Sequence, residues 1–417
     1  MLPFNSYNLI YWRITFLTEF SSRQLFITVI LLGILSMLGP VGHDIFIPSI
    51  PNIANGLNTT TNLVSVSISA IFLGNAIGTL FHGPLSDRFG RKPVILWILG
   101  IYAISATSAA LSPNVETLIF FRFFQGVALS GGRVLSAAVA RDLFDKERLG
   151  KVMSDIMSVA AIAAVIAPIV GGFTAKYLPW QSSLVFMAIF GGLVFILFAF
   201  MFKERNTTVQ ENTLRLTVLF KNIATITTNY TFQMYSLCGG FMLAGLILFL
   251  SVSANIIIES YGVSAESYGF MFATVSLCYL IGTFIGSKLV TRLSLNRIVA
   301  WGVILGLIGG TTMLAMALMA IRTPTAVIFP MGIFIFGLAF VNPNTVAGAL
   351  QPFPGIAGTA SSLTSFVRGI MGAAVSFSAS LFRHDDAFAM ATTIFLLACM
   401  AAIFYRFGIQ NEFKRTE

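Results

Sequence analysis

The residues of this sequence that could do chemistry are charged side chains placed inside long apolar stretches. Asp44 is the only acid in the first such stretch, and three arginines lie away from the ends of later ones: Arg122, Arg133 and Arg368. Ionisable groups within a membrane-spanning helix are costly, so they mark a functional site. A carboxyl in an apolar cavity suits a group that must gain and lose a proton, so we expect Asp44 to exchange protons. The alternative places Asp44 near the outer surface, as a solvated helix end.

Pro48 follows Asp44 by one helical turn. Proline lacks the amide that would bond the Asp44 carbonyl, so the helix is expected to weaken at the acid itself. We interpret the three histidines, His43, His82 and His384, as residues of the membrane interface. A role as a proton relay would require a partner that the sequence does not reveal.

Arg122 and Arg133 belong to one predicted helix face. With Gly126 and Leu129 between them, the spacings are four, three and four residues, so all four side chains lie on one side of a helix. Arginines on an intramembrane face avoid lipid, so this face is expected to line a central cavity. Arg122 lies at about the depth of Asp44, which predicts that the two interact electrostatically. The predicted cavity residues are Asp44, Arg122, Gln125, Gly126, Leu129, Arg133 and Arg368.

Few acids are available to neutralise these arginines. Besides Asp44, the candidate is Asp155, near the start of the fifth apolar stretch, which could pair with Arg133. A structural ion pair and a role in substrate binding both remain open for Arg133. If no acid reaches Arg133 or Arg368, the cavity is positive and favours anionic or zwitterionic ligands.

A second cluster of charges lies in Gly83–Pro93, between the second and third apolar stretches. Because both stretches can cross a bilayer, this segment is expected at a membrane surface, and its three cations indicate the cytoplasmic surface. Gly83 and Gly90 permit a tight backbone, and Asp87 is expected to cap the following helix. The residues predicted to form a conformational gate here are Gly83, Asp87, Arg88, Gly90, Arg91, Arg141 and Asp142.

The composition is that of an integral membrane protein. The chain has 417 residues, of which 56% are hydrophobic and 10% charged, whereas a soluble domain carries about 25% charged residues. The net charge of +9 arises from cations that gather in the predicted inside segments. It therefore reflects membrane topology and requires no nucleic-acid partner. The three cysteines fall in apolar stretches, so no disulfide framework is expected.

Twelve apolar stretches of about 20 residues predict twelve membrane-spanning helices. They are expected at 24–46, 62–82, 94–111, 116–139, 151–174, 182–202, 234–258, 266–287, 297–320, 325–349, 357–381 and 387–406. A polar interval divides them six and six. The predicted divisions are a cytoplasmic N-terminus (1–23), a first bundle (24–202), a cytoplasmic linker with a short helix around 214–224 (203–233), a second bundle (234–406) and a cytoplasmic C-terminus (407–417).

Several stretches together carry a resemblance to a known family. Gly83–Pro93 resembles the G-x-L-a-D-R-x-G-R-[KR] signature of the major facilitator superfamily. Asp44–Pro51, Arg122–Gly126 and Pro168–Gly172 resemble motifs of its twelve-span drug:proton antiporters, closest to the bicyclomycin-resistance and chloramphenicol-efflux (Bcr/CflA) family. The resemblance implies an all-α membrane fold of two pseudo-symmetric six-helix bundles.

The resemblance also implies roles for individual residues. Asp44 would be the proton-coupling acid and Arg122 its cationic partner. Pro168, Gly171 and Gly172 would form the antiporter motif, in which small residues let helices approach closely. Arg133 and Arg368 depart from the family, where uncharged residues are expected at these positions.

The leading hypothesis is proton-coupled export of small amphiphilic organic compounds by alternating access. The alternative is transport of an organic anion, such as a carboxylate metabolite or a siderophore, through the intramembrane arginines. The sequence shows no metal-ligand cluster and no nucleophile with a base, so we expect neither an enzyme nor a cofactor. The expected partners are a small-molecule substrate, protons and the lipid bilayer. We expect a monomer in the bacterial inner membrane with both termini cytoplasmic.

Overall fold

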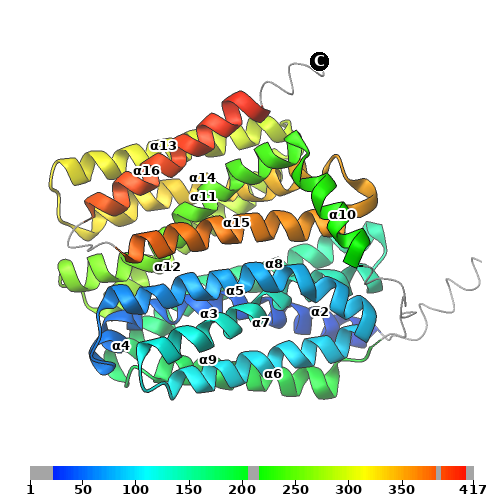
Figure 1. The fold of residues 1–417 in the computed structure, drawn as a ribbon, viewed down its shortest axis with the longest axis horizontal. Coiled ribbons are helices and arrows are strands. Elements are labelled where there is room, and N and C mark those ends of the chain that lie inside the picture. Colours follow the sequence, from blue (N-terminus) through cyan, green and yellow to red (C-terminus); the bar gives the residue numbers. More distant parts are fainter. Residues whose placement is uncertain (1–21, 205–215, 382–386, 410–417) are drawn as a thin grey trace, which may run out of the picture.

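The computed structural model describes residues 22–204, 216–381 and 387–409, and these residues form helices without a β-strand. The helices lie side by side with their long axes roughly parallel or antiparallel (Figure 1). The predicted terminal segments 1–23 and 407–417 lie largely outside the described residues.

The first half of the chain begins with a span that is broken into short helices. Its elements are α2 (Ser22–Ser36), α3 (Leu38–Asp44), the 3-10 helix η1 (Ile47–Ser49), α4 (Ile50–Gly56), α5 (Thr61–Phe89), α6 (Arg91–Ala110), α7 (Val115–Leu143), α8 (Lys146–Tyr177) and α9 (Ser182–Met201).

The second half begins with a short helix, α10 (Leu216–Thr227), at the place where the sequence predicts one in the linker. The elements that follow are α11 (Tyr230–Ala254), the π-helix η2 (Asn255–Ser260), α12 (Ala265–Leu289), α13 (Leu295–Leu318), α14 (Pro324–Leu350), the 3-10 helix η3 (Pro354–Ile356), α15 (Ala357–Ser380), α16 (Phe388–Ile403) and the π-helix η4 (Phe404–Ile409).

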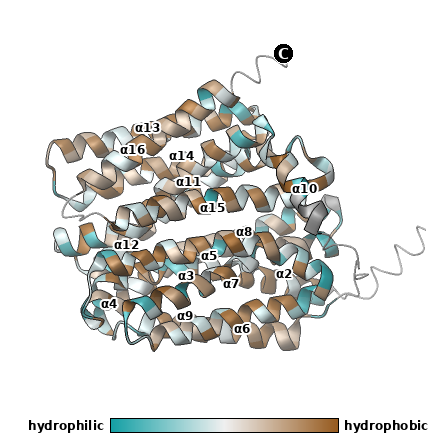
Figure 2. Ribbon diagram, viewed as in Figure 1, coloured by the Kyte–Doolittle hydropathy of each residue, from teal (hydrophilic) through white to brown (hydrophobic). Residues whose placement is uncertain are grey.

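Eleven helical segments of the described chain are long and apolar enough to cross a membrane. α15 is not one of them, although its 24 residues give it a similar length, because it carries Arg368 and many serines and threonines. It packs along α5 and α11, so it completes the twelve spans that the sequence predicts. Hydrophobic residues predominate along the lengths of the helices (Figure 2).

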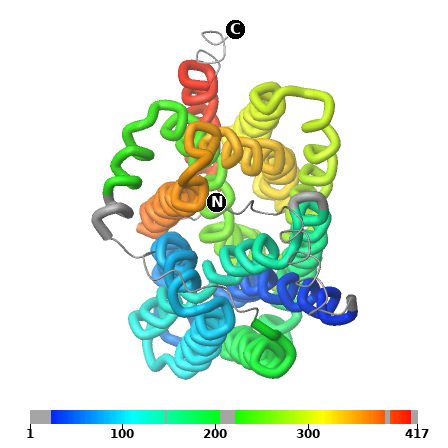
Figure 3. Tube along the Cα trace, turned by 90° about the vertical axis from the view of Figure 1, so that its right-hand side faces the viewer, coloured from blue at the N-terminus to red at the C-terminus, as the bar shows by residue number. Residues whose placement is uncertain are grey.

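The helices pack into two groups, each formed by one half of the chain. Within α2–α9, α7 packs against α5 and α6, and within α11–α16, α14 packs against α11 and α13. The two groups meet where α5 lies along α15 and α8 along α12 (Figures 1 and 3). Both groups contribute fully buried side chains to the hydrophobic core, which include Leu35, Ile68 and Leu99 from the first and Phe249 and Phe334 from the second.

The two ends of the helices can be told apart by two glycines with positive φ. Gly90, with φ of 93°, separates α5 from α6 at one end. Gly262, with φ of 68°, lies between η2 and α12 at the other end. These are called the Gly90 end and the Gly262 end below.

The first span breaks at Asp44, as the sequence predicts. α3 ends at Asp44, the chain turns through Ile45 and Phe46, and Pro48 lies within the 3-10 helix that follows. The missing proline amide leaves the Asp44 carbonyl without its helical partner, which accounts for the break.

The prediction of a loop over Gly83–Pro93 is wrong. α5 continues through Pro84 to Phe89, and α6 begins at Arg91, so Gly90 alone separates the two helices. Asp87 does not cap α6. The cap is the Glu204 carboxylate, which accepts hydrogen bonds from the backbone amides of Arg91 and Lys92. A carboxylate is favoured there because the first amides of a helix have no partner within the helix.

Candidate proton and substrate site

Asp44 forms a hydrogen-bonded pair with the residue before it. Nδ1 of His43 lies 2.6 Å from Oδ1 of Asp44, and the Asp44 side chain is only 5% exposed. The His43 ring is 20% exposed and packs against the Phe72 ring of α5, with 5.6 Å between ring centroids. The alternative of a solvated helix end is therefore wrong. His43 is the partner that the sequence interpretation missed, although its position beside Asp44 was a signal.

The Asp44 segment lies against both groups of helices. A Cβ atom added at Gly171 of α8 would overlap the Ile45 carbonyl, so only glycine lets α8 approach the break in the first span. Tyr268 of α12 lies close enough to Asp44 to interact electrostatically. The Tyr268 hydroxyl is also 2.7 Å from the Ser253 hydroxyl. Asp44 therefore lies where the first group of helices meets the second.

Arg122 does not form an ion pair with Asp44 in the described structure. Its Nη1 donates to the Gly42 carbonyl and to Oε1 of Gln125, each at 2.8 Å. Its guanidinium carbon lies 4.2 Å from the centroid of the Phe46 ring, a distance suited to a cation–π contact. Nε and Nη2 of Arg122 have no hydrogen-bond partner. Arg122 thus contacts the Gly42 carbonyl before Asp44 and the Phe46 ring after it.

Part of the predicted cavity face is buried within the protein. Arg122 and Gln125 are fully buried, and Leu129 is 8% exposed. Gly126 packs against the backbone of Ile71 in α5, where a Cβ atom would overlap it. These residues lie inside the first group of helices, because α3 and α5 cover the face of α7 that carries them.

Arg133 lies on the same helix but is exposed. It forms no ion pair or hydrogen bond among the described residues, and so none with Asp155. It lies close enough to Tyr279 of α12 and Arg368 of α15 to interact with them electrostatically. Arg133 therefore lies toward the second group of helices.

Arg368 is buried and is satisfied by neutral acceptors. Its Nη2 donates to Oγ1 of Thr345 at 2.8 Å, and its Nη1 donates to Oδ1 of Asn342 at 3.1 Å. Asn342 also donates to the Tyr279 hydroxyl at 3.2 Å. No ion pair of Arg368 is present in the described structure, so its positive charge is not neutralised there.

The predicted gate residues gather around Arg91. Arg91 forms ion pairs with Asp87 at 2.6 Å and with Asp142 at 2.8 Å. Arg88 instead lies over the Phe89 ring, and Arg141 donates to a carbonyl of its own helix. The ion pairs join α5, α6 and α7 within the first group of helices.

Contacts between the two groups gather toward the Gly262 end. Ser69 of α5 lies 2.6 Å from Ser376 of α15, which lies 2.5 Å from Ser251 of α11. Lys176 of α8 forms an ion pair with Glu266 of α12. A Cβ atom added at Gly172 would lie 2.7 Å from the Ala265 carbonyl oxygen, so the absence of a side chain at Gly172 permits this close approach. The groups are closed against each other at this end.

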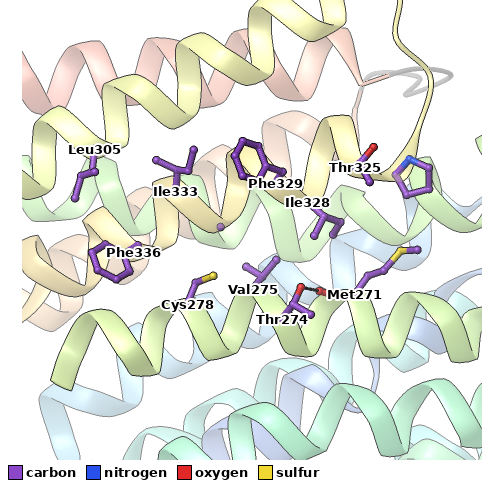
Figure 4. Close-up of a pocket in the computed structure, with 12 residues that line it drawn as sticks. Met271, Thr274, Val275, Cys278, Leu305, Thr325, Ile328, Phe329, Ile333 and Phe336 are labelled. Atoms are coloured by element: carbon purple, nitrogen blue, oxygen red, sulfur yellow. Dashed lines mark hydrogen bonds between the residues drawn. The ribbon is translucent and has the colours of Figure 1, made fainter. Parts of the chain in front are cut away.

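A pocket of about 440 Å³ lies elsewhere, between α12, α13 and α14 (Figure 4). Its lining is almost entirely apolar and includes Met271, Cys278 and Phe336. None of the predicted cavity residues lines it. Phe329 in its wall is 61% exposed, so the pocket opens at the surface of the second group. No cluster of metal-binding side chains occurs among the described residues.

Comparisons with known proteins agree with this arrangement. The family model described as Major Facilitator Superfamily matches residues 25–376. The chain is 30% identical over 398 residues to a bicyclomycin resistance protein homolog of Haemophilus influenzae, covering 94% of this chain and 98% of that protein. It is 24% identical over 387 residues to a chloramphenicol resistance protein of Pseudomonas aeruginosa, covering 90% of this chain and 91% of that protein.

A solved structure shares the fold. The xylose transporter XylE from E. coli, in a partially occluded inward open conformation, superposes with a TM-score of 0.71 at 15% identity, covering 93% of this chain and 97% of that one. The long family match and the coverage of the relatives agree with the twelve helices in two groups. The chain therefore belongs to the major facilitator superfamily and is similar to its bicyclomycin and chloramphenicol resistance proteins.

Proposed function

We propose that this protein exports small amphiphilic organic compounds in exchange for protons, by alternating access. The observation that carries the proposal is the buried Asp44 carboxyl, bonded to His43 at the break in the first span. A buried ionisable group within a membrane-spanning segment is costly unless it has a function. The drug-resistance names of the relatives support export of such compounds.

In this mechanism Asp44 is the group that gains and loses the proton. His43 accepts or donates at the same carboxyl and, being partly exposed, connects it to water. Arg122 is a positioning residue, because it holds the Gly42 carbonyl and the Phe46 ring on either side of the acid. Protonation of Asp44 can be coupled to movement of the helix groups because two residues connect its segment to its surroundings. Tyr268 lies near Asp44 from the second group, and Gly171 lets α8 pack on the Ile45 carbonyl.

We assign the Gly90 end to the cytoplasm. The cations of Gly83–Pro93 and of the segment after α7 lie at this end, and cytoplasmic segments are enriched in lysine and arginine. The structure, closed toward the Gly262 end, then corresponds to an inward-facing state. In the outward-facing state the cluster of Arg91, Asp87 and Asp142 would meet the second group. We further propose a monomeric carrier of the bacterial inner membrane with cytoplasmic termini and no enzymatic activity.

The test is proton release on substrate addition. Purified protein is reconstituted in liposomes with an internal pH dye, and chloramphenicol or bicyclomycin is added. We expect the wild type to couple proton movement to drug movement and Asp44→Asn to lose the coupling while keeping its thermal unfolding midpoint. Glu116→Gln, which removes an exposed acid at the start of α7, is the matched control. Normal coupling in Asp44→Asn would refute the proposal.

A further inference from the structure

Arg133 differs from the other two arginines within the spans. Arg122 and Arg368 are buried, and both donate hydrogen bonds to neutral acceptors of the protein. Arg133 is exposed, and among the described residues it has neither a hydrogen bond nor an ion pair. A guanidinium at the depth of a membrane-spanning helix is retained only where it meets water, a counter-charge or a ligand.

Arg133 has a second cation within electrostatic range. Arg368 adds a second charge from the other group of helices, and its hydrogen bonds go to neutral groups. Asp155, the acid that the sequence offers as a partner for Arg133, is exposed and forms no ion pair with it within the described chain. No ion pair among the described residues neutralises the charge of Arg133.

A polar group that can bind an oxyanion comes from the second group of helices. The Tyr279 hydroxyl of α12 lies within electrostatic range of both Arg133 and Arg368. The same hydroxyl accepts a hydrogen bond from Asn342 of α14, so its own proton remains free for a further acceptor. A ligand between α7 and α12 would meet two donors, the Arg133 guanidinium and the Tyr279 hydroxyl.

We propose that Arg133 and Tyr279 form an anion-binding subsite, which takes a carboxylate or a similar oxyanion of the exported compound. The inference deepens the proposed function, since it names the charge of the cargo. The planar guanidinium can bind both oxygens of a carboxylate, and such charge-assisted hydrogen bonds are stronger than neutral ones. The exported compounds then include amphiphilic organic acids and zwitterions beside neutral compounds such as chloramphenicol.

The test uses three probes of one shape and different charge. Thermal unfolding of the purified protein is followed against 1-naphthoate, 1-naphthamide and 1-naphthylmethylamine, because a ligand that binds the native state raises the midpoint. We expect naphthoate to raise the unfolding midpoint of the wild-type protein more than the other two probes do. Arg133→Gln should weaken naphthoate binding about tenfold or more, the loss of one charge-assisted hydrogen-bonding group. Arg133→Lys keeps the charge but not the planar pair of donors. Its affinity for naphthoate should therefore lie between those of the wild type and Arg133→Gln.

The matched control is Arg322→Gln, which removes an exposed arginine from the connection between α13 and α14. It should bind naphthoate like the wild type. The inference is overturned if the amide or the amine stabilises as well as naphthoate does, if no probe stabilises, or if Arg133→Gln binds naphthoate normally.

Failure of the inference is distinguishable from failure of the proposed function. Asp44-dependent proton release is measured with a neutral compound, chloramphenicol, in the same preparations. If that release persists while the naphthoate results fail, the subsite is wrong and the antiport stands. If Asp44-dependent release fails while Arg133-dependent naphthoate binding holds, the subsite belongs to a carrier with another coupling mechanism.

Discussion

Nη1 of Arg122 lies 2.8 Å from the carbonyl oxygen of Gly42, two residues before Asp44. The last carbonyls of a helix have no partner within it, and α3 ends at Asp44. Arg122 therefore caps the helix that carries the acid, and its positive charge is favourable at a helix C-terminus. The contact fixes the position of Asp44 without neutralising its carboxylate directly.

Replacing Arg122 by leucine should release the end of α3. The Gly42 carbonyl and Gln125 would lose their donor in a buried environment, which costs about 1–3 kcal/mol. We expect a lower thermal unfolding midpoint and loss of proton coupling. Arg122→Lys, with a single charged donor, should recover part of the midpoint. Arg297→Gln, an exposed arginine at the start of α13, is the control. An unchanged midpoint in Arg122→Leu would contradict the capping role.

Replacing His43 by asparagine should alter the pH dependence of antiport without abolishing it. Nδ1 of His43 lies 2.6 Å from the Asp44 carboxyl and the His43 ring is partly exposed, so His43 can pass protons between the acid and water. In His43→Asn this relay is lost, so initial proton release should be slower and should depend on pH differently. The measurement is initial proton release from liposomes across pH 5 to about 9. A profile identical to the wild type would exclude His43 from the proton path.

Replacing Gly172 by alanine should open the Gly262 end. The new Cβ would lie 2.7 Å from the Ala265 carbonyl oxygen and 3.1 Å from Cα of Glu266, so the two groups must separate. The readout is maleimide labelling of a cysteine placed at Ser376, which is fully buried between the groups. We expect faster labelling in Gly172→Ala. Gly192→Ala is the matched control, because nothing lies within 4 Å of its added Cβ. Equal labelling rates in Gly172→Ala and the wild type would show that closure of the Gly262 end does not depend on the contact of Gly172 with Ala265.

Replacing Gly90 by alanine should destabilise the junction of α5 and α6. Its φ of 93° is rarely adopted by residues with a side chain, and the added Cβ would lie 2.7 Å from Oε1 of Glu204. Residues forced into such conformations cost about 1–3 kcal/mol. We expect a lower unfolding midpoint. Gly83→Ala lies within α5, its added Cβ meets nothing within 4 Å, and it should be neutral or slightly stabilising. The prediction fails if both variants behave alike.

Several features were set by residues close together in the sequence. The apolar stretches predicted the spans, because about 20 apolar residues suffice to cross a bilayer. Pro48 predicted the break at Asp44, because a proline acts on the carbonyl four residues before it. Gly90 was correctly expected where the backbone is tight, although the loop around it proved to be helix on both sides.

The partners of the charged residues depended on packing between distant segments. Glu204 caps α6 from 113 residues away, and Arg122 bonds Gly42 from 80 residues away. No periodicity in the sequence specifies such contacts, because they arise only when helices from different spans meet. The same packing buried Arg122 and left Arg133 exposed, although both lie on one predicted face.

The sequence by itself thus determined which residues are charged within the membrane and where the helices run. Only the tertiary structure decided that Arg122 bonds the Gly42 carbonyl instead of Asp44 and that Arg133 has no partner among the described residues. The physical reason is the distance along the chain over which each interaction acts. Helix formation and breaking depend on neighbours within about one turn, whereas the charge that faces a side chain depends on which helix packs opposite.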